Sequence, residues 1–183
     1  TPDGMVSEII DASGDEAGHA FGAPSDIAVD ASGNVYVPGR TTNNAFMITP
    51  EAVITEIVDS SGAPGASTLA EPNGICGDPA GNVYVAGYGS DNAFEITPDG
   101  VITLIIHGTG DGGGNKLLRP AGITADAWGN AYVGGGGSDN VFKITPEREK
   151  TQIIEATGDG TGIVLFQPRG LSILYEDHDI LVV

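Results

Sequence analysis

The sequence repeats itself with a period of 48 residues and without a gap, and this feature decides what the chain can fold into. A proline opens each copy, at Pro24, Pro72, Pro120 and Pro168. The motif Asp-x-x-Gly-Asn keeps the same spacing and begins at Asp30, Asp78 and Asp126. Because one such unit cannot bury its apolar faces alone, the copies must pack against one another.

Each unit has the pattern of four short strands. In the first unit the expected strands cover residues 26–30, 34–37, 44–48 and 53–58. Val, Ile, Tyr, Phe and Thr dominate these segments, whereas Gly, Pro, Asn and Asp lie between them. Four-stranded units of roughly 40 to 50 residues are typical of β-propeller blades. We therefore predict an all-β propeller with complete blades at residues 24–71, 72–119 and 120–167.

A fourth blade is expected to be split between the two chain ends, within a single domain of residues 1–183. Residues 168–183 match the first half of a unit, and residues 1–23 match the second half. One strand is missing, since the equivalent of residues 139–144 would follow Val183. A three-stranded blade, a longer native chain and a strand from a neighbouring chain all remain open. Because an unpaired edge invites strand pairing, we expect self-association through the open blade.

The charge balance excludes several partners. The chain has 25 acidic and seven basic residues, for a net charge of −18. A nucleic-acid-binding surface needs clustered bases, so we expect no nucleic-acid partner. No apolar run reaches the length of a membrane span, so we expect no membrane insertion. Cys76 is the only cysteine, which excludes a disulfide within the chain and suggests a small buried side chain.

Three motifs carry a resemblance to a known family. They are the glycine-rich segment 108–114 leading to Pro120, the hairpin 78–85, and the strand and exit turn 94–100. Together they resemble the NHL-repeat family of β-propellers. The resemblance implies a binding platform, although some such propellers are enzymes. We expect a non-enzymatic binding or assembly module for a protein or glycan partner, outside the cytoplasm: secreted, periplasmic or at the cell surface.

The residue after each recurring proline should begin the innermost strand and face the central channel. These residues are Ser25, Asn73, Ala121 and Arg169. Around Asn73 the chain is also similar, more distantly, to gluconolactonase-like (senescence-marker) propellers, which implies a divalent-metal ligand at this position. Arg169 at another ligand position disfavours a cation, so we expect no cofactor, with calcium or another divalent ion as the alternative. The alternative function is a lyase or lactonase with metal or substrate in the channel.

Two further sets of residues are candidates for contacts. Arg119 and Arg169 flank the inner-strand prolines and, with Ser25 and Asn73, are the expected ligand-binding residues of the channel. Guanidinium groups there would hold a carboxylate or sulfate, or neutralise nearby acids. The partner-binding candidates are Arg40, Tyr88 and Trp128. No nucleophile is paired with a base in the sequence, so we assign no catalytic residue.

The Asp-x-x-Gly-Asn motif has two interpretations. Calcium prefers six to eight oxygen ligands, and each copy of the motif offers one Asp and one Asn. An Asp side chain can instead accept N–H groups of a tight turn, where glycine supplies a positive φ. Because the motif recurs in every complete unit, we favour the turn.

Overall fold

The fold is all-β. The computed structural model describes residues 4, 6–158, 164–174 and 179–182. These residues form three four-stranded antiparallel sheets and one two-stranded sheet, which confirms the predicted propeller blades. The described residues contain no helix, and hence none that could cross a membrane.

Each four-stranded sheet is one blade, and its strands follow sequence order. Blade 1 consists of β1 (Ala28–Val29), β2 (Val35–Gly39), β3 (Asn44–Ile48) and β4 (Ile54–Val58). Blade 2 consists of β5 (Pro72–Gly77), β6 (Val83–Gly87), β7 (Asn92–Ile96) and β8 (Ile102–Ile106). Blade 3 consists of β9 (Pro120–Ala125), β10 (Ala131–Gly135), β11 (Asn140–Ile144) and β12 (Lys150–Ile154). The two-stranded sheet, here the C-terminal strand pair, consists of β13 (Leu171–Leu174) and β14 (Asp179–Val182).

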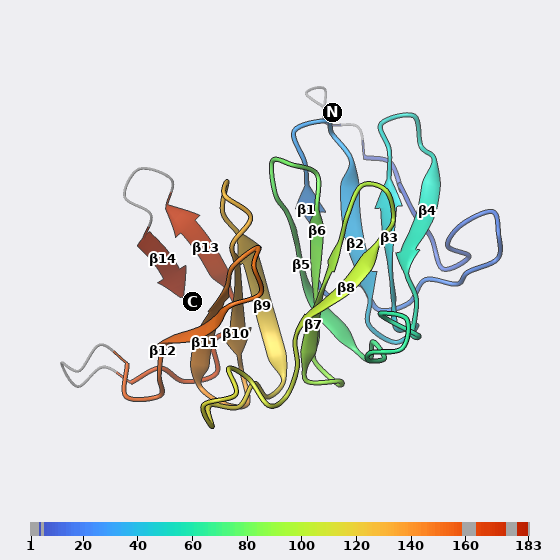
Figure 1. Ribbon diagram of the computed structural model, residues 1–183. Helices are drawn as coiled ribbons and strands as arrows, with labels where there is room; N and C mark the ends of the chain where they lie inside the picture. The colour runs from blue at the N-terminus through green and yellow to red at the C-terminus, as the bar shows by residue number, and fades with distance from the viewer. Residues whose placement is uncertain (1–3, 5, 159–163, 175–178, 183) are drawn as a thin grey trace.

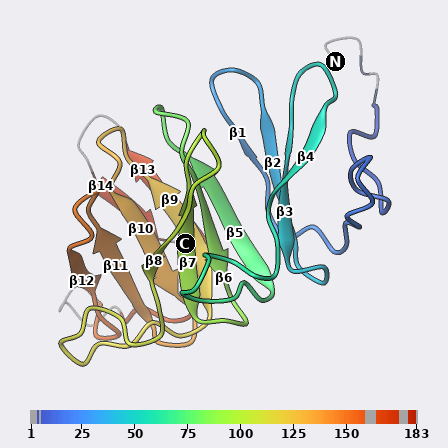
Figure 2. The same ribbon diagram turned by 45° about the vertical axis from the view of Figure 1, so that its right-hand side comes forward.

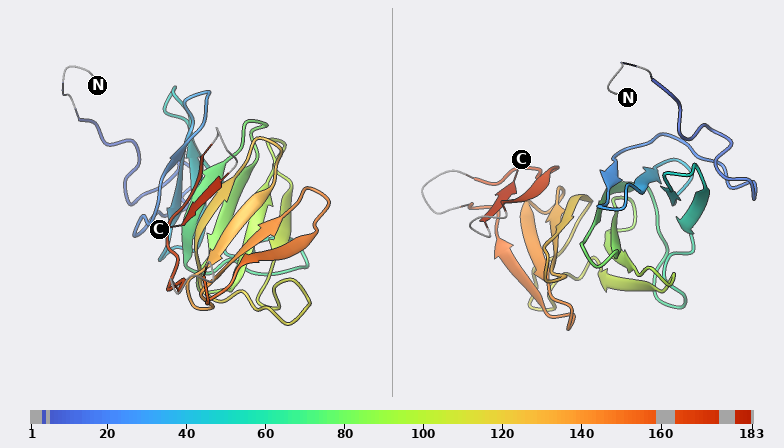
Figure 3. Two further views of the ribbon diagram at one scale, coloured as in Figure 1. Left: turned by 90° about the vertical axis from the view of Figure 1, so that its left-hand side faces the viewer. Right: turned by 90° about the horizontal axis from the view of Figure 1, so that it is seen from above.

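The blades stand face to face in a curved row (Figure 1 and, turned by 45°, Figure 2). The view from above in Figure 3 places the N-terminal segment, residues 6–23, beside blade 1 and the C-terminal strand pair beyond blade 3. The N-terminal segment contains no strand. Residues 1–3, 5, 175–178 and 183 of the predicted fourth unit lie outside the described residues. The joining of both ends in one blade therefore stays a prediction.

The Asp-x-x-Gly-Asn motif builds the hairpin between the first two strands of each blade. In blade 2, Asp78 Oδ1 accepts the backbone N–H groups of Ala80 and Asn82, each at 2.9 Å. Asp78 Oδ2 accepts Asn82 Nδ2 at 2.8 Å and the Tyr84 hydroxyl at 3.1 Å. Gly81 adopts a φ of +88°. The favoured turn interpretation is thus confirmed, because both carboxylate oxygens serve the hairpin.

At two positions in the long loops, Gly62 and Gly110, the backbone leaves no room for a side chain. A Cβ on Gly110 would lie 1.7 Å from the carbonyl oxygen of Asn115, and one on Gly62 would lie 2.3 Å from that of Ser67. Both have φ values in the left-handed region, +67° and +62°. Backbone passes where a side chain would sit, which explains why glycine recurs here in every unit.

The core lies between the blades, and its members repeat. Phe94 belongs to the core between blades 1 and 2, and Phe142 occupies the equivalent place between blades 2 and 3. Both side chains have no solvent exposure. Each follows a register shift at the same point of its third strand, between residues 93 and 94 or 141 and 142. The two inter-blade cores are therefore built alike.

No four-stranded sheet precedes blade 1 among the described residues, and the outer face of blade 1 is exposed in part. Ile75 and Ile123 lie on the inner strands of blades 2 and 3, pack against the blade before, and are 3% and 5% exposed. Their equivalent in blade 1, Ile27, is 60% exposed. The N-terminal segment covers another part of this face, where Phe21 meets Phe46 edge to face at 5.7 Å between ring centres.

Candidate functional site

A small cavity brings together three of the sequence-predicted residues. Tyr88, Arg119 and Arg169 line it together with Ala121 and Asp139, and its volume is about 200 Å³. We call it the arginine pocket. Arg119 and Arg169 are exposed, and Tyr88 is half-buried. Two guanidinium groups at one small cavity can bind a carboxylate or sulfate through paired N–H donors.

Carboxylates shape the loops that carry these arginines. Asp91 Oδ1 accepts the backbone N–H of Arg119, and Asp139 Oδ1 accepts that of Gln167, both at 2.7 Å. Arg119 and Gln167 have φ values of +48° and +46°, which non-glycine residues rarely adopt. The same bond joins Asn43 to Glu71 at 2.8 Å. Each of these hydrogen bonds holds the turn that leads into an inner strand. The recurring turn therefore sets the backbone position from which each of these residues extends its side chain.

Arg40 is already paired. Its Nη2 donates to Glu71 Oε2 at 2.8 Å, and its Cζ lies 5.3 Å from the centre of the Tyr88 ring. The guanidinium thus neutralises a nearby acid, Glu71, and stacks on Tyr88, a partner-binding candidate. It connects blade 1 with blade 2 beside the arginine pocket. A role of Arg40 in binding a partner stays a prediction.

The other candidates lie apart from the arginine pocket. Ser25 Oγ donates to the carbonyl oxygen of Pro72 at 2.9 Å, so it joins two blades. Asn73 is half-buried on β5. Trp128 is 62% exposed on the hairpin turn of blade 3, where its backbone N–H donates to Asp126 Oδ1 at 3.0 Å. Cys76 packs against the core between blades 2 and 3, and burial raises the pKa of its thiol.

Metal ligands do not converge in the part of the chain that the structure describes. No group of three or more His, Cys, Asp or Glu side chains there could hold an ion. Asn73 is therefore not joined by such a group of metal ligands among the described residues. It stays a prediction taken from the resemblance.

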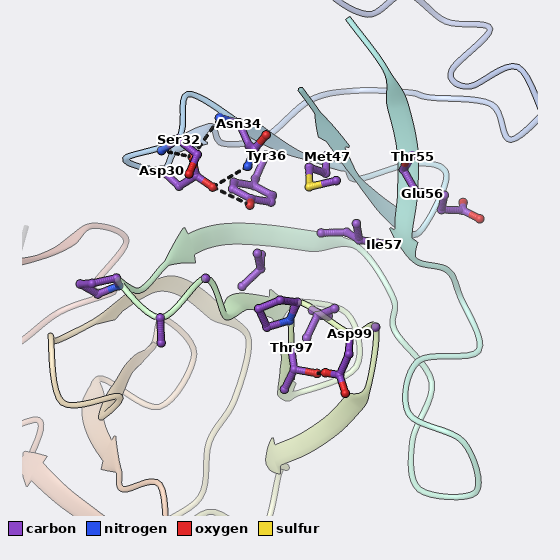
Figure 4. Close-up of a pocket in the computed structure, with 17 residues that line it drawn as sticks. Asp30, Ser32, Asn34, Tyr36, Met47, Thr55, Glu56, Ile57, Thr97 and Asp99 are labelled. Atoms are coloured by element: carbon purple, nitrogen blue, oxygen red, sulfur yellow. Dashed lines mark hydrogen bonds between the residues drawn. The ribbon is translucent and has the colours of Figure 1, made fainter. Parts of the chain in front are cut away.

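A larger groove lies between blades 1 and 2, and the sequence had not singled it out. Its volume is about 710 Å³. Blade 1 supplies Asp30, Tyr36 and Met47, and blade 2 supplies Asp99 and Gly100. Figure 4 shows the Asp30 carboxylate bonded to its own hairpin and the Asp99 carboxylate bonded to Thr97, with Glu56 turned away. Met47 and Ile57 also line the groove. We call it the blade 1–2 groove.

The sequence did hold a signal for this groove. Met47, Glu95 and Lys143 occupy one position of the repeat, each paired across strands with a tyrosine, and all three differ. Ala52, Gly100 and Arg148 occupy a second variable position. Blade construction alone therefore does not fix the residues at these positions.

Comparison with known proteins supports the fold. No protein-family model and no curated protein sequence matches the chain. A streptogramin B lyase matches in structure with a TM-score of 0.67 and 14% identity, over 89% of this chain and 48% of that one. A catalytically inactive virginiamycin B lyase from Staphylococcus aureus with quinupristin matches with a TM-score of 0.67 and 19% identity, over 87% of this chain and 48% of that one. A chain of the nidogen/laminin complex matches with a TM-score of 0.67 and 18% identity, over 89% of this chain and 56% of that one.

These likenesses show a β-propeller fold. The chain spans about half the length of the propellers that it matches. Membership of the NHL-repeat family stays a prediction, since no family model matches.

Proposed function

We propose that this chain is a propeller module that binds protein, and that the partner of its open end is a second copy of itself. The observation that carries the proposal is the exposure of Ile27, 60% against 3% and 5% for Ile75 and Ile123 at the equivalent positions. An isoleucine that packs against a neighbouring blade in two copies is ready to do so in the third. Burying such a side chain is worth about 1.5 to 3 kcal/mol.

The two ends of the chain match different strands of one blade. The N-terminal residues 6–10, Val-Ser-Glu-Ile-Ile, match β4, Ile-Thr-Glu-Ile-Val, one period later. The C-terminal strand pair matches the first two strands of a blade. The strand pair of one copy would cover Ile27 and Val29 of the next copy. The N-terminal segment of that next copy would then lie as the outer strand of a shared blade.

Self-assembly of this kind would cover the exposed outer face of blade 1 and pair the C-terminal strand pair at the same time. Val29, on β1 and two residues after Ile27, is also exposed, at 65%. Strand edges that are left unpaired favour pairing with another chain. A chain of similar fold in the nidogen/laminin complex is part of a protein–protein assembly, which supports a binding role for such modules.

The test is the oligomeric state by native mass spectrometry and light scattering over a range of concentrations. The unchanged chain should form dimers or larger particles, and Ile27→Asp should weaken association at least about ten-fold. Val101→Asp is the matched control, since Val101 is 53% exposed but lies outside the face. Because Ile27 is exposed, the variant should melt like the parent. A monomer up to about 100 µM, or an oligomer that Ile27→Asp leaves intact, contradicts the proposal.

A further inference from the structure

The four arginines of the chain differ in whether a carboxylate holds them. Arg40 and Arg148 each form an ion pair with a glutamate. The guanidinium groups of Arg119 and Arg169, by contrast, make no ion pair or hydrogen bond among the described residues. Both of these arginines line the arginine pocket. In a chain with 25 acidic residues, two guanidinium groups at one cavity thus keep their donors available to a ligand.

The contact between blades 1 and 2 fills the equivalent place with its own side chains. There the Tyr88 ring lies 5.3 Å from Arg40 Cζ, and Glu71 neutralises that guanidinium. One period later, Glu71 becomes Arg119 and Tyr88 becomes Gly136. The contact between blades 2 and 3 therefore has a cation in place of the acid and no side chain in place of the ring. The arginine pocket, of about 200 Å³, lies at this place.

Two aromatic side chains line the same pocket. Tyr88 is half-buried there, and Phe166 is 73% exposed. Backbone hydrogen bonds hold the chain on both sides of Phe166. The N–H of Leu165 donates to a carbonyl of the loop after β12 at 3.1 Å, and that of Gln167 donates to Asp139 Oδ1 at 2.7 Å. The pocket therefore offers a ligand apolar ring surface as well as guanidinium donors.

The charge of the lining favours an anion with a single charge. Arg119 and Arg169 outnumber the one lining carboxylate, Asp139, which accepts the N–H of Gln167. The pocket is thus locally positive on a chain of net charge −18. Because that overall charge repels anions at long range, a monocarboxylate suits the pocket better than a multiply charged ligand.

We propose that the arginine pocket binds a small monocarboxylate that carries an aromatic ring. The carboxylate would accept N–H donors of Arg119 and Arg169, and the ring would lie against Tyr88 and Phe166. A cavity of about 150 Å³ accommodates a benzene ring. The volume of about 200 Å³ thus has room for one ring and its carboxylate. The lining residues belong to one copy of the chain, so this binding does not depend on self-assembly.

The test titrates the protein with phenylacetate, phenylacetamide and acetate, followed by ¹H–¹⁵N NMR. Phenylacetate should give saturable shifts at Tyr88, Gly136 and Arg169, with a Kd of about 1 mM. Phenylacetamide lacks the charge and acetate lacks the ring, so each should bind about ten-fold more weakly. Equal binding of the amide or of acetate, or no saturable shift at about 10 mM phenylacetate, overturns the proposal.

A matched pair of variants locates the site. Arg169→Gln removes one guanidinium of the pocket and should weaken phenylacetate binding about ten-fold. Lys116→Gln, the control, removes the same charge from an exposed side chain outside the pocket and should leave binding unchanged. Because both side chains are exposed, each variant should keep the parental NMR spectrum away from its own position. Phenylacetate binding that Arg169→Gln leaves unchanged places the ligand outside the pocket and overturns the proposal.

Discussion

The two contacts between neighbouring blades, here called joints, have similar buried cores. They differ at the rim, which is the position of Glu95 and Arg148 in one joint and of Met47 and Gly100 in the other. Both cores contain a fully buried phenylalanine, Phe94 or Phe142, after the same register shift. At the rim, the joint between blades 2 and 3 is spanned by Glu95 and Arg148. The joint between blades 1 and 2 has Met47 and Gly100 there and opens into a groove of about 710 Å³. The core thus fixes how blades stack, and the rim is left to vary.

The largest expected effect tests the likeness of the cores. Phe94→Ala and Phe142→Ala should each lower the free energy of unfolding by about 3 to 5 kcal/mol, because each leaves a cavity in a closed core. The two losses should agree within about 1 kcal/mol if the joints share one design. Urea unfolding followed by circular dichroism measures both. A loss at Phe94 less than half that at Phe142 would show that the groove loosens the core beneath it.

A medium effect on stability should come from removing the ion pair between Glu95 and Arg148, which spans blades 2 and 3. Arg148→Gly leaves the Glu95 carboxylate, 12% exposed, without its cation, which should cost about 1 to 3 kcal/mol of stability. Adding Glu95→Met to that variant copies the open joint and removes the stranded charge. The double variant should therefore be more stable than Arg148→Gly alone, in the same urea unfolding experiment.

Two controls sharpen this result. Lys116→Ala removes an exposed cation outside both joints and should leave stability nearly unchanged. The single variant Glu95→Met completes the double-mutant cycle, which isolates the coupling between the two side chains. Strictly additive losses would mean that Glu95 and Arg148 act independently and that the two rims do not differ through this pair.

The sequence was sufficient for the blades and insufficient for the joints. The 48-residue period predicted the four-stranded sheets because each unit repeats its own turns and strands locally. It also placed Arg119 and Arg169 together, since residues beside the recurring prolines fall at the same end of each blade. Glu95 and Arg148, by contrast, meet across 53 positions of sequence, from a strand of blade 2 and a turn of blade 3. Their meeting depends on how far one blade is offset from the next, which a repeat alone does not specify.

The same reason explains the uneven outcome for the channel residues. Ser25, Asn73, Ala121 and Arg169 share one repeat position, yet only Ala121 and Arg169 line the arginine pocket. Ser25 is used by the neighbouring blade, whose Pro72 carbonyl accepts its hydroxyl. Residues at one repeat position therefore differ in what they contact in the described structure.

The smallest expected effect compares the tyrosines under the two rims. The Tyr36 hydroxyl donates to Asp30, whereas that of Tyr84 has both Asp78 and Glu95 as acceptors. Burial, followed by the bond to Asp30, raises the pKa of Tyr36 to about 12. Burial and two carboxylates raise the pKa of Tyr84 further in the same direction. An absorbance titration of phenolate should therefore show Tyr36 ionising before Tyr84. Tyr36→Phe should lower the amplitude of the step near pH 12, to which Tyr132 also contributes, and Tyr84→Phe should leave that step intact.

The sign of the effect on stability follows from where the proton is held. A tyrosine whose pKa is about 12 in the folded chain keeps its proton at a pH where the unfolded chain, with an ordinary value of about 10, has lost it. This contribution is complete below about pH 10 and is lost as the pH rises toward 12. Thermal melts between these values should show a shallower decline for Tyr36→Phe than for the parent. An unchanged slope would mean that the open rim already exposes Tyr36 to water, and that the two joints differ below the rim as well.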